Sequence, residues 1–327
     1  MKVLAGDIGG TKTLLAVFDT DTKPFRLVRE ERFESARFEG LEGVVRAFFS
    51  KGRDEIGAAC FAIAGPVKAG EEVRMSNLSW TVVSERRLAA ELNVPRTRLV
   101  NDFGAVGYGI EQLVPEDLAT LQAGKPDPTG PIAVLGAGTG LGEAFVLWDG
   151  AKRIVHASEG GHVDFAPRTP LEADLLQFLA KEHGRVSYER VVSGMGIANI
   201  FRFLSETKVE KPSPDVVREM KSEDPAAVVS RHALAKTDRC CERALDVFTS
   251  IYGAQAGNLA LAILATGGVY VAGGIAPRNL TKLRDGTFVR AFRDKGRLAS
   301  LVESIPVHII LNTRVGLLGA ASLAARP

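Results

Sequence analysis

The chain has 327 residues, a length typical of two domains with substantial cores. Hydrophobic residues make up 46% of it and charged residues 24%, which excludes a disordered or fibrous protein. The formal charge of +2 is too small to indicate binding to nucleic acid or to an acidic membrane surface, so we expect a small-molecule partner.

The cysteine content and the N-terminus predict a cytoplasmic protein. Cys60, Cys240 and Cys241 are too few for a disulfide framework, and the apolar run before Asp7 is too short for a secretory signal. The uncharged residues 251–277 are long enough to cross a bilayer. Because two glycines split them into a helix-like half and a strand-like half, they predict a buried helix followed by a buried strand.

The first residues predict a β-hairpin. An apolar strand leads into the Gly-rich turn at Asp7–Lys12, and a second apolar strand ends at Asp19. The same pattern returns at residues 131–150, which read PIAVLGAGTGLGEAFVLWDG. We therefore predict an internal duplication, and the alternating strands and helices that continue each half favour an α/β architecture.

Other strands are predicted from short apolar runs, which are typical of strands covered on both faces. These runs are residues 58–63, 97–100, 132–135, 144–148, 269–273 and 307–311. The Pro-rich residues 124–131 predict a linker just before the second hairpin.

Two helices have clear signals. One is predicted to begin after Thr169, which can cap it, with Pro170 in its first turn and Glu172 completing a capping box; Gly184 follows its end. The second is predicted from about residue 232 to 264 by apolar residues near one packed side, which are Leu234, Cys241, Leu245, Phe248, Tyr252 and Leu259.

Three glycine sites could hold a nucleotide. Glycines let backbone amides approach an anion, so the turns at Asp7–Lys12 and Gly136–Gly142 could clamp phosphates from two sides. Each turn alone is more typical of a tight hairpin. Neither fits a Walker A or a dinucleotide motif, because Lys12 follows a Thr and the second turn leads into a strand. Gly273 and Gly274 follow a buried strand, where adenosine could lie against bare backbone.

Polar residues follow the predicted strand at 97–100. Asn101 and Asp102 lie at its carboxyl end, where ligands bind in open α/β sheets. An Asp at this place could accept a proton from a hydroxyl nucleophile. Either residue could equally be the N-cap of a helix.

A third polar segment surrounds two glycines. Glu159 and His162 flank Gly160-Gly161, which opposes a helix, and no cysteine lies nearby, so a zinc site is disfavoured. A loop that presents both side chains to sugar hydroxyls is one interpretation, and a surface turn with a hydrogen-bonded His is the other. Glu189 alone is indistinguishable from a surface charge on a helix.

Taken together, these segments resemble the bacterial ATP-dependent glucokinase family, within the group that shares the actin, hexokinase and Hsp70 ATPase fold. The resemblance covers nearly the whole chain and follows the family order. Its motifs are DIGGTKTLLAVFD (7–19), AIAGPV (62–67), MSNLSW (75–80), VNDFGAVGYG (100–109), GAGTGLGEAF (136–145), EGGHVDF (159–165), ERVVSGMGI (189–197) and VAGGIAP (271–277). The Cys-rich zinc motif of related sugar kinases is missing, which points to the zinc-free branch.

The resemblance implies two α/β domains of the ribonuclease H-like fold with a cleft between them: residues 1–105 plus 313–327, and residues 106–312. It implies phosphorylation of glucose at the 6-hydroxyl to feed glycolysis, with ATP and Mg²⁺ as cofactors and a homodimer as the assembly. Asp102 would be the general base, and Asp7 would help to position Mg²⁺. The other implied sugar ligands are Asn101, Glu159, His162, Glu189 and Asn77. The implied ATP ligands are Asp7, Gly9, Gly10, Thr11, Lys12, Gly138, Thr139, Gly140, Gly273 and Gly274.

Other functions stay open at this point. Kinases for mannose, fructose or an amino sugar would need the same residue types. A protein-directed ATPase of the actin or chaperone kind would not need Asn101, Asp102, Glu159 and His162 together. A sugar-sensing transcription regulator would need an N-terminal helix-turn-helix, for which the first predicted strand leaves no room.

Overall fold

The structure, a computed structural model, describes all residues except 53, 66, 68–79, 81 and 327. The chain forms two compact units. Unit 1 comprises Met1–Leu118, Val155–Ala157 and Asn312–Pro327, and unit 2 comprises Ala119–Ile154 and Ser158–Leu311. The domain boundary that we placed at residue 105 falls inside a helix, Asp102–Gly109, whose residues all belong to unit 1. Since a helix is one rigid element, α3 belongs to unit 1 as a whole, and unit 1 continues to Leu118.

Unit 1 is built from five strands and four helices among its described residues. The elements are β1 (Lys2–Ile8), β2 (Lys12–Asp19), β3 (Arg26–Glu34), α1 (Leu41–Phe49), β4 (Ala58–Ile63), α2 (Glu85–Leu92), β5 (Thr97–Asn101), α3 (Asp102–Gly109) and α13 (Val315–Ala325), with the 3₁₀ turns η1 (Ser35–Arg37), η2 (Ile110–Gln112) and η3 (Pro115–Asp117).

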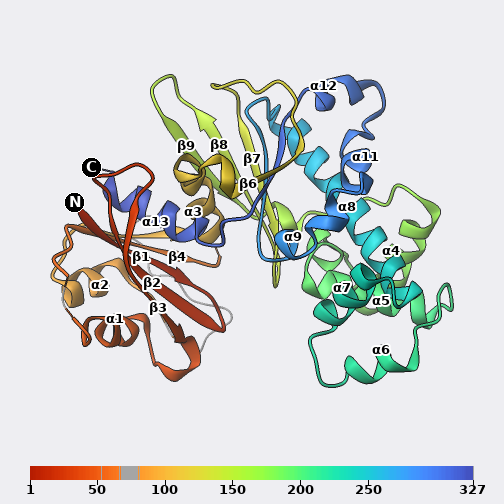
Figure 1. Ribbon diagram of the computed structural model, residues 1–327, viewed down its shortest axis with the longest axis horizontal. Coiled ribbons are helices and arrows are strands. Elements are labelled where there is room, and N and C mark those ends of the chain that lie inside the picture. Colours follow the sequence, from red (N-terminus) through yellow and green to blue (C-terminus); the bar gives the residue numbers. More distant parts are fainter. Residues whose placement is uncertain (53, 66, 68–79, 81, 327) are drawn as a thin grey trace. The chain divides into compact units, whose positions relative to one another are not determined.

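The sheet of unit 1 has the order β3-β2-β1-β4-β5 and is covered on both faces (Figure 1). Strands β1 and β2 form the predicted antiparallel hairpin. Alternate residues of the strands point to opposite faces. Leu4, Leu15 and Phe61 pack with α1 and α2 on one face. Val3 and Cys60 pack with the apolar face of α13 on the other.

Helices α13 and α3 cross at glycines. An added methyl group on Gly319 would overlap the carbonyl oxygen of Ala105, and one on Gly109 would overlap that of Val315. The absence of side chains at these two positions therefore allows the helix backbones to touch.

We expect Gly319→Ala to lower the free energy of unfolding by about 1–3 kcal/mol, because overpacking forces the backbones apart. Gly43→Ala is the matched control, because Gly43 lies inside helix α1 and a methyl group there would make only an ordinary contact with Phe38. The control should raise stability by about 0.5–1 kcal/mol. Urea denaturation measures both, and equal stability of the two variants would contradict the close crossing.

Unit 2 holds the remaining elements. They are β6 (Leu118–Gln122, whose first residue belongs to unit 1), β7 (Ile132–Ala137), β8 (Leu141–Trp148), β9 (Arg153–Ser158, of which Val155–Ala157 belong to unit 1), η4 (Gly160–His162), α4 (Pro170–His183), η5 (Tyr188–Arg190), α5 (Gly194–Glu206), α6 (Pro214–Glu219), α7 (Pro225–Ala235), α8 (Arg239–Ile263), β10 (Gly268–Ala272), α9 (Ile275–Arg278), α10 (Leu280–Leu283), α11 (Thr287–Arg293), η6 (Gly296–Leu298), α12 (Ala299–Glu303) and β11 (Val307–Ile310).

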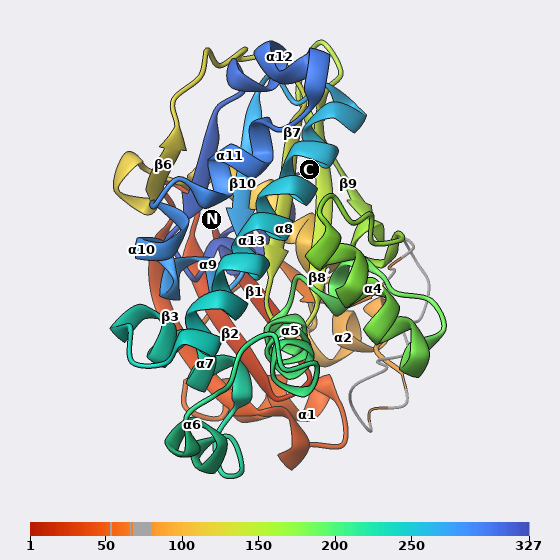
Figure 2. The same cartoon turned by 90° about the vertical axis from the view of Figure 1, so that its right-hand side faces the viewer.

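The second sheet repeats the first, as the predicted duplication requires. Its order, β9-β8-β7-β10-β11 with β6 added at the edge, matches β3-β2-β1-β4-β5 strand for strand. In both sheets the hairpin is antiparallel and the next two strands are parallel to its first strand. Helix α8 crosses this sheet and packs on β7 and β10 in a single core (Figure 2).

The long helix predicted from residue 232 to 264 is wrong in extent. Helix α7 ends at Ala235, because Lys236 adopts the left-handed conformation with φ 56°. Asp238 then caps α8 by accepting a hydrogen bond from the Cys241 N–H, at 2.8 Å. Leu234, which we assigned to the packed side, is 40% exposed.

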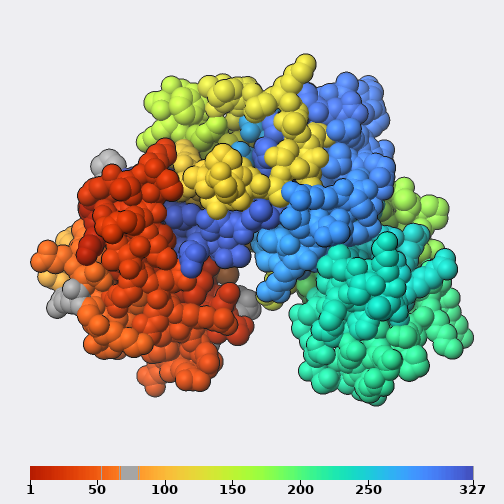
Figure 3. All heavy atoms as spheres, in the orientation of Figure 1, coloured from red at the N-terminus to blue at the C-terminus, as the bar shows by residue number. Residues whose placement is uncertain are grey.

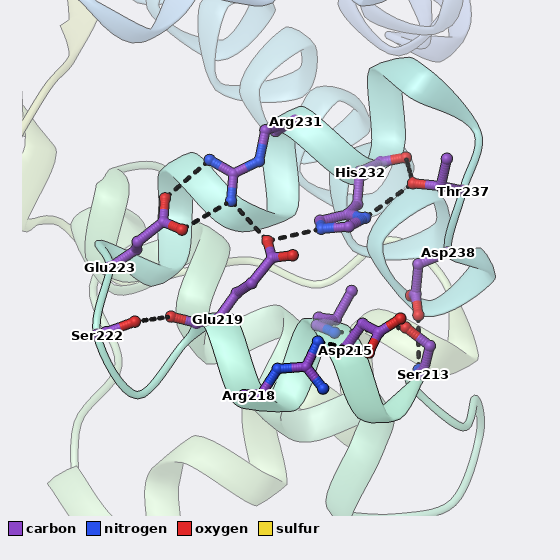
Figure 4. A network of polar contacts seen from close by, with 11 residues as sticks. Ser213, Asp215, Arg218, Glu219, Ser222, Glu223, Arg231, His232, Thr237 and Asp238 are labelled. Atoms are coloured by element: carbon purple, nitrogen blue, oxygen red, sulfur yellow. Dashed lines mark hydrogen bonds and ion pairs between the residues drawn. The ribbon is translucent and has the colours of Figure 1, made fainter.

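A polar network holds the corner formed by α6 and α7 (Figure 4). Glu219 accepts from His232 Nε2 at 2.9 Å and from Arg231 Nη2 at 2.6 Å, and these bonds hold the pKa of its carboxyl below the ordinary value. Arg231 also pairs with Glu223 at 2.8 Å. The segment, coloured teal, lies on the face drawn in Figure 3.

The predicted start of α4 is confirmed, but its capping box is only half formed. Thr169 accepts from the Glu172 N–H, and Pro170 begins the helix. The Glu172 carboxylate accepts instead from the N–H and guanidinium of Arg168, one residue before the cap. Burial explains this choice, since Glu172 is 3% exposed and Arg168 brings it a positive charge.

Residues 124–131 are not a linker between the units. They lie within unit 2 between β6 and β7, and the Asp127 N–H donates to the Thr266 carbonyl at 3.0 Å.

The prediction of a buried helix followed by a strand over residues 251–277 is confirmed by α8 and β10. Within the described part of the chain, no helix has the length and apolar character needed to span a membrane.

Candidate active site

The predicted site residues of unit 1 gather at one edge of its sheet. Strands β1, β4 and β5 are parallel, so their carboxyl ends lie at the same edge. Asp7 pairs with Ala62, and Ala62 pairs with Val100, the residue before Asn101. At a strand spacing of about 4.8 Å, the backbone of Asp7 is thus roughly 10 Å from the end of β5.

Asp7 is a partly buried carboxylate at the end of β1. Burial raises the pKa of its carboxyl, and the positive charge of Lys12 partly opposes this rise. Its Oδ2 lies near Gly316 of α13, 4.0 Å from where a methyl group would be. A carboxylate in such surroundings is stabilised in its ionised form by a nearby cation.

The turn between β1 and β2 is held by a hydrogen bond from the buried Ser35. The Gly9 N–H donates to the Lys12 carbonyl at 2.9 Å, and the Ser35 hydroxyl donates to the Gly9 carbonyl at 2.9 Å. Ser35 is fully buried, whereas Thr11 and Lys12 are exposed. The outer part of the turn, including Gly10, is therefore available to a ligand.

Asn101 and Asp102 lie at the end of β5, where the N-cap interpretation is confirmed for Asn101. Asn101 is the N-cap of α3, since its Oδ1 accepts from the Gly104 N–H at 2.9 Å and its Nδ2 donates to the Gly65 carbonyl at 2.9 Å. Asp102 is the first residue of the helix, and its Oδ1 accepts from the Phe103 N–H at 2.8 Å. Asn77, the remaining predicted ligand, lies outside the described residues.

In unit 2, the second Gly-rich turn lies against Gly273 and the start of α5. Gly138 donates its N–H to the Gly140 carbonyl and accepts from the Gly194 N–H, both at 2.8 Å. Gly273 has φ +82°, and a methyl group there would overlap the Ala137 carbonyl. The sheet thus brings two of the predicted nucleotide segments side by side, and Thr139 between the glycines is exposed.

Two glycines leave open space beside these segments. A methyl group on Gly138 or on Gly274 would meet no atom within 4 Å. Neither residue has a positive φ, so neither needs to be glycine for its backbone conformation. Open space in front of a backbone that does not require glycine is typical of a surface that a ligand approaches.

Glu159, His162 and Glu189 are brought together in unit 2. His162 Nε2 is 3.8 Å from Glu159 Oε2, and its Nδ1 is 3.9 Å from Glu189 Oε1. The Glu159 and His162 side chains are 55% and 53% exposed, so their polar atoms are free to meet hydroxyl groups. Arg185 holds this loop by donating to the His162 carbonyl at 2.8 Å.

Glu189 also contacts the Gly-rich turn. Its Oε2 accepts from the Leu141 N–H at 3.0 Å and lies where a methyl group on Gly140 would be. The predicted sugar ligands and the predicted phosphate turn of unit 2 are therefore direct neighbours, an arrangement that phosphoryl transfer to a hydroxyl requires.

Sequence reasoning missed two supporting residues. Ser35 carries no local signal, since it follows a strand that the pattern did not predict. Glu143 lies within the motif of residues 136–145, but only the structure shows that it is 1% exposed and bonded to Gln255, far away in the sequence. The three cysteines are free and buried, and no group of three or more His, Cys, Asp or Glu residues in the described ranges could hold a metal ion.

Solved structures identify the class of protein that this fold and site define. A glucokinase from an Antarctic psychrotroph matches 99% of this chain and 98% of its own with a TM-score of 0.86 and 32% identity. A ROK family glucokinase from Streptomyces griseus, solved with glucose and AMPPNP, covers 99% of both chains with a TM-score of 0.65 and 19% identity, which shows the shared fold. The fold is that of the actin-like ATPases, in the form found in sugar kinases.

Sequence comparison gives the family. The profile of the Glucokinase family matches residues 4–327. The glucokinase of Nostoc punctiforme is 47% identical over 99% of both chains, and that of Cronobacter sakazakii is 39% identical over 98% of this chain and 95% of its own. The chain belongs to the glucokinase family and is a kinase.

Proposed function

We propose that the protein transfers the γ-phosphoryl group of ATP to the 6-hydroxyl of glucose, giving glucose 6-phosphate for glycolysis. The observation that carries the proposal is the contact of Glu189 with the Gly138–Gly140 turn, because it joins hydroxyl recognition to phosphate binding. The names of the relatives support the same reaction. The glucokinase of Balamuthia mandrillaris was solved with glucose.

In this proposal, Asp102 is the general base. Its carboxylate accepts the proton of the 6-hydroxyl as the bond from that oxygen to the γ-phosphorus forms, while the bond to the β,γ-bridging oxygen breaks and ADP leaves. Its position at the carboxyl end of β5 supports this role. Asn101, Glu159, His162 and Glu189 would hold the other hydroxyls, with Asn77 as a further candidate.

The nucleotide would bind along the glycine segments. Gly9, Gly10, Thr11 and Lys12 from unit 1, with Gly138, Thr139 and Gly140 from unit 2, offer amide, hydroxyl and ammonium donors to phosphate oxygens. The open space beside Gly138 and Gly274 supports this assignment, and Gly273 and Gly274 would lie near the adenosine.

The residues also fit Mg²⁺. Magnesium is commonly bound by one or two carboxylates together with substrate phosphates, and Asp7 supplies one carboxylate beside the Gly9–Lys12 turn. Its raised pKa fits a group that gains from a cation. When bound, Mg²⁺ would neutralise charge on the phosphates.

Direct detection of the product tests the proposed reaction. Purified protein is mixed with Mg·ATP and with glucose, mannose, fructose or N-acetylglucosamine separately, and phosphorus NMR follows the sugar 6-phosphate. We expect product with glucose at the highest kcat/KM. A greater kcat/KM with another hexose would show that this hexose is the substrate. If ATP binds but none of the four sugars is phosphorylated, a protein-directed ATPase would be favoured.

Assembly and location complete the proposal. We propose a homodimer, on the resemblance to the family, and a cytoplasmic enzyme, because its three free cysteines suit a reducing compartment and ATP is supplied there. Light scattering at assay concentration tests the dimer, and a mass equal to one chain would contradict it.

A further inference from the structure

A buried polar chain lies behind the proposed sugar ligands of unit 2. It begins at Glu143 on β8, whose side chain is almost fully buried. Glu143 Oε1 accepts a hydrogen bond from Gln255 Nε2 at 2.8 Å, and Gln255 is 3% exposed on α8. Burying a carboxyl costs free energy even when an amide donates to it, which indicates a role for Glu143 beyond packing.

The chain continues from Gln255 to η5. Gln255 Oε1 accepts from Asn258 Nδ2 at 3.3 Å, and the same amide donates to the Tyr188 hydroxyl oxygen at 3.0 Å. Asn258 Oδ1 accepts from Lys295 Nζ at 2.8 Å. Four side chains, Glu143, Gln255, Asn258 and Tyr188, thus connect β8 through α8 to η5.

Both ends of the chain meet segments that carry sugar ligands. A methyl group on Gly160 would overlap Glu143 Oε2, so the carboxyl lies directly against η4, between Glu159 and His162. At the other end, Tyr188 is the residue before Glu189. The backbone that carries Glu159, His162 and Glu189 is therefore supported by these hydrogen-bonded side chains.

We propose that Glu143 is a positioning residue for sugar binding: it supports the η4 turn that presents Glu159 and His162, and Gln255 links it through Asn258 to the segment of Glu189. This inference rests on the proposed assignment of those three ligands. Small displacements of groups that orient a substrate have large effects, so loss of this support weakens sugar binding without touching ATP.

The ionisation of Glu143 makes the proposal testable by pH. Burial raises the pKa of its carboxyl from 4.5 to about 7, although the bond from Gln255 opposes the rise. The groups that face the Glu143 carboxyl are Gln255 and Tyr252 from α8, and η4 packs against it at Gly160. Lys295 reaches the hydrogen-bonded chain at Asn258.

The raised pKa of Glu143 determines the direction in which the glucose KM changes with pH. Two states of the η4 turn are compared: packed against the buried Glu143 carboxyl, and displaced from it so that the carboxyl has its ordinary pKa. Between the two pKa values the packed state keeps the carboxyl protonated, whereas the displaced state loses the proton. Packing is fully favoured below about pH 4.5, weakens as the pH rises, and becomes constant above about pH 7. We therefore expect the KM for glucose to rise over this interval and then level off.

Three variants test the proposal, with KM for glucose, KM for ATP and kcat measured at several values between about pH 4 and 8. Glu143→Gln keeps the shape and cannot ionise, so its glucose KM should match the wild type at acid pH and lose the carboxyl-dependent rise. Glu143→Ala should raise the glucose KM about tenfold or more at every pH, with less than a twofold change for ATP. Glu172→Gln, the control, alters another buried carboxyl of unit 2 and should keep the wild-type profile.

Two results would overturn the proposal: an unchanged pH profile in Glu143→Gln, or a wild-type glucose KM in folded Glu143→Ala. If Glu143→Ala does not fold, the Glu143→Gln profile decides alone. Glu159→Ala and Glu189→Ala are measured in the same series. If neither raises the glucose KM, the ligand assignment has failed; if both do and the Glu143 variants do not, only the positioning role has failed.

Discussion

Asp102→Ala is expected to lower kcat by about 10²- to 10⁴-fold, the contribution of a well-placed general base. ATP binding should survive, because the proposed phosphate ligands lie on other segments of the chain. Asp102→Asn should lose as much, since an amide keeps the shape but cannot accept the proton. A coupled assay for ADP gives kcat, and calorimetry gives the Kd for ATP.

The control for this prediction is Asp215→Ala. Asp215 also lies in the first turn of a helix, α6, and pairs with Arg218 on the surface of unit 2. Its loss removes a helix-terminal carboxylate without touching a proposed ligand, so kcat should stay near the wild type. A near-normal rate in Asp102→Ala would show that another group accepts the proton.

Gly138→Val is expected to raise the KM for ATP by about tenfold or more, which corresponds to about 1.4 kcal/mol of lost binding. The added side chain meets no protein atom near the backbone and fills the space assigned to a phosphate. The Tm should therefore change little. Initial rates at varied ATP, together with thermal denaturation, measure the two effects.

Gly140→Ala is the informative comparison, because it lies in the same turn and has a different neighbour. Its methyl group would displace the Glu189 carboxylate from the Leu141 N–H, so the KM for glucose should rise more than that for ATP. If Gly138→Val and Gly140→Ala changed the KM for the same substrate, the proposal that Gly138 faces ATP and Gly140 faces the glucose ligand Glu189 would be contradicted.

Local patterns predicted the parts of the fold that depend on neighbouring residues. The two hairpins follow from apolar runs around Gly-rich turns, and β4 was predicted to the residue because all six of its side chains are buried. The break before α8 also had a local signal, since Asp238 is a good N-cap residue, but the apolar spacing on either side concealed it.

Other features had no local signal. Whether Asn101 caps a helix or faces a ligand depends on which backbone groups surround it, and the structure shows the capping bonds. The burial of Glu143 depends on α8 packing over β8, and the contact of Glu189 with Leu141 joins segments with two helical elements between them. Such pairings arise from tertiary packing, which a single sequence does not encode in any one window.

The packing of α13 has a consequence for biosynthesis. The face of the first sheet formed by Val3, Ala5 and Phe18 is covered by α13, which follows unit 2 in the chain and is therefore made after it. Nascent unit 1 therefore carries an uncovered apolar surface until α13 has been made, whereas most of unit 2 is contiguous and can mature earlier. Unit 1 is thus the first unit to be started and the second to be completed.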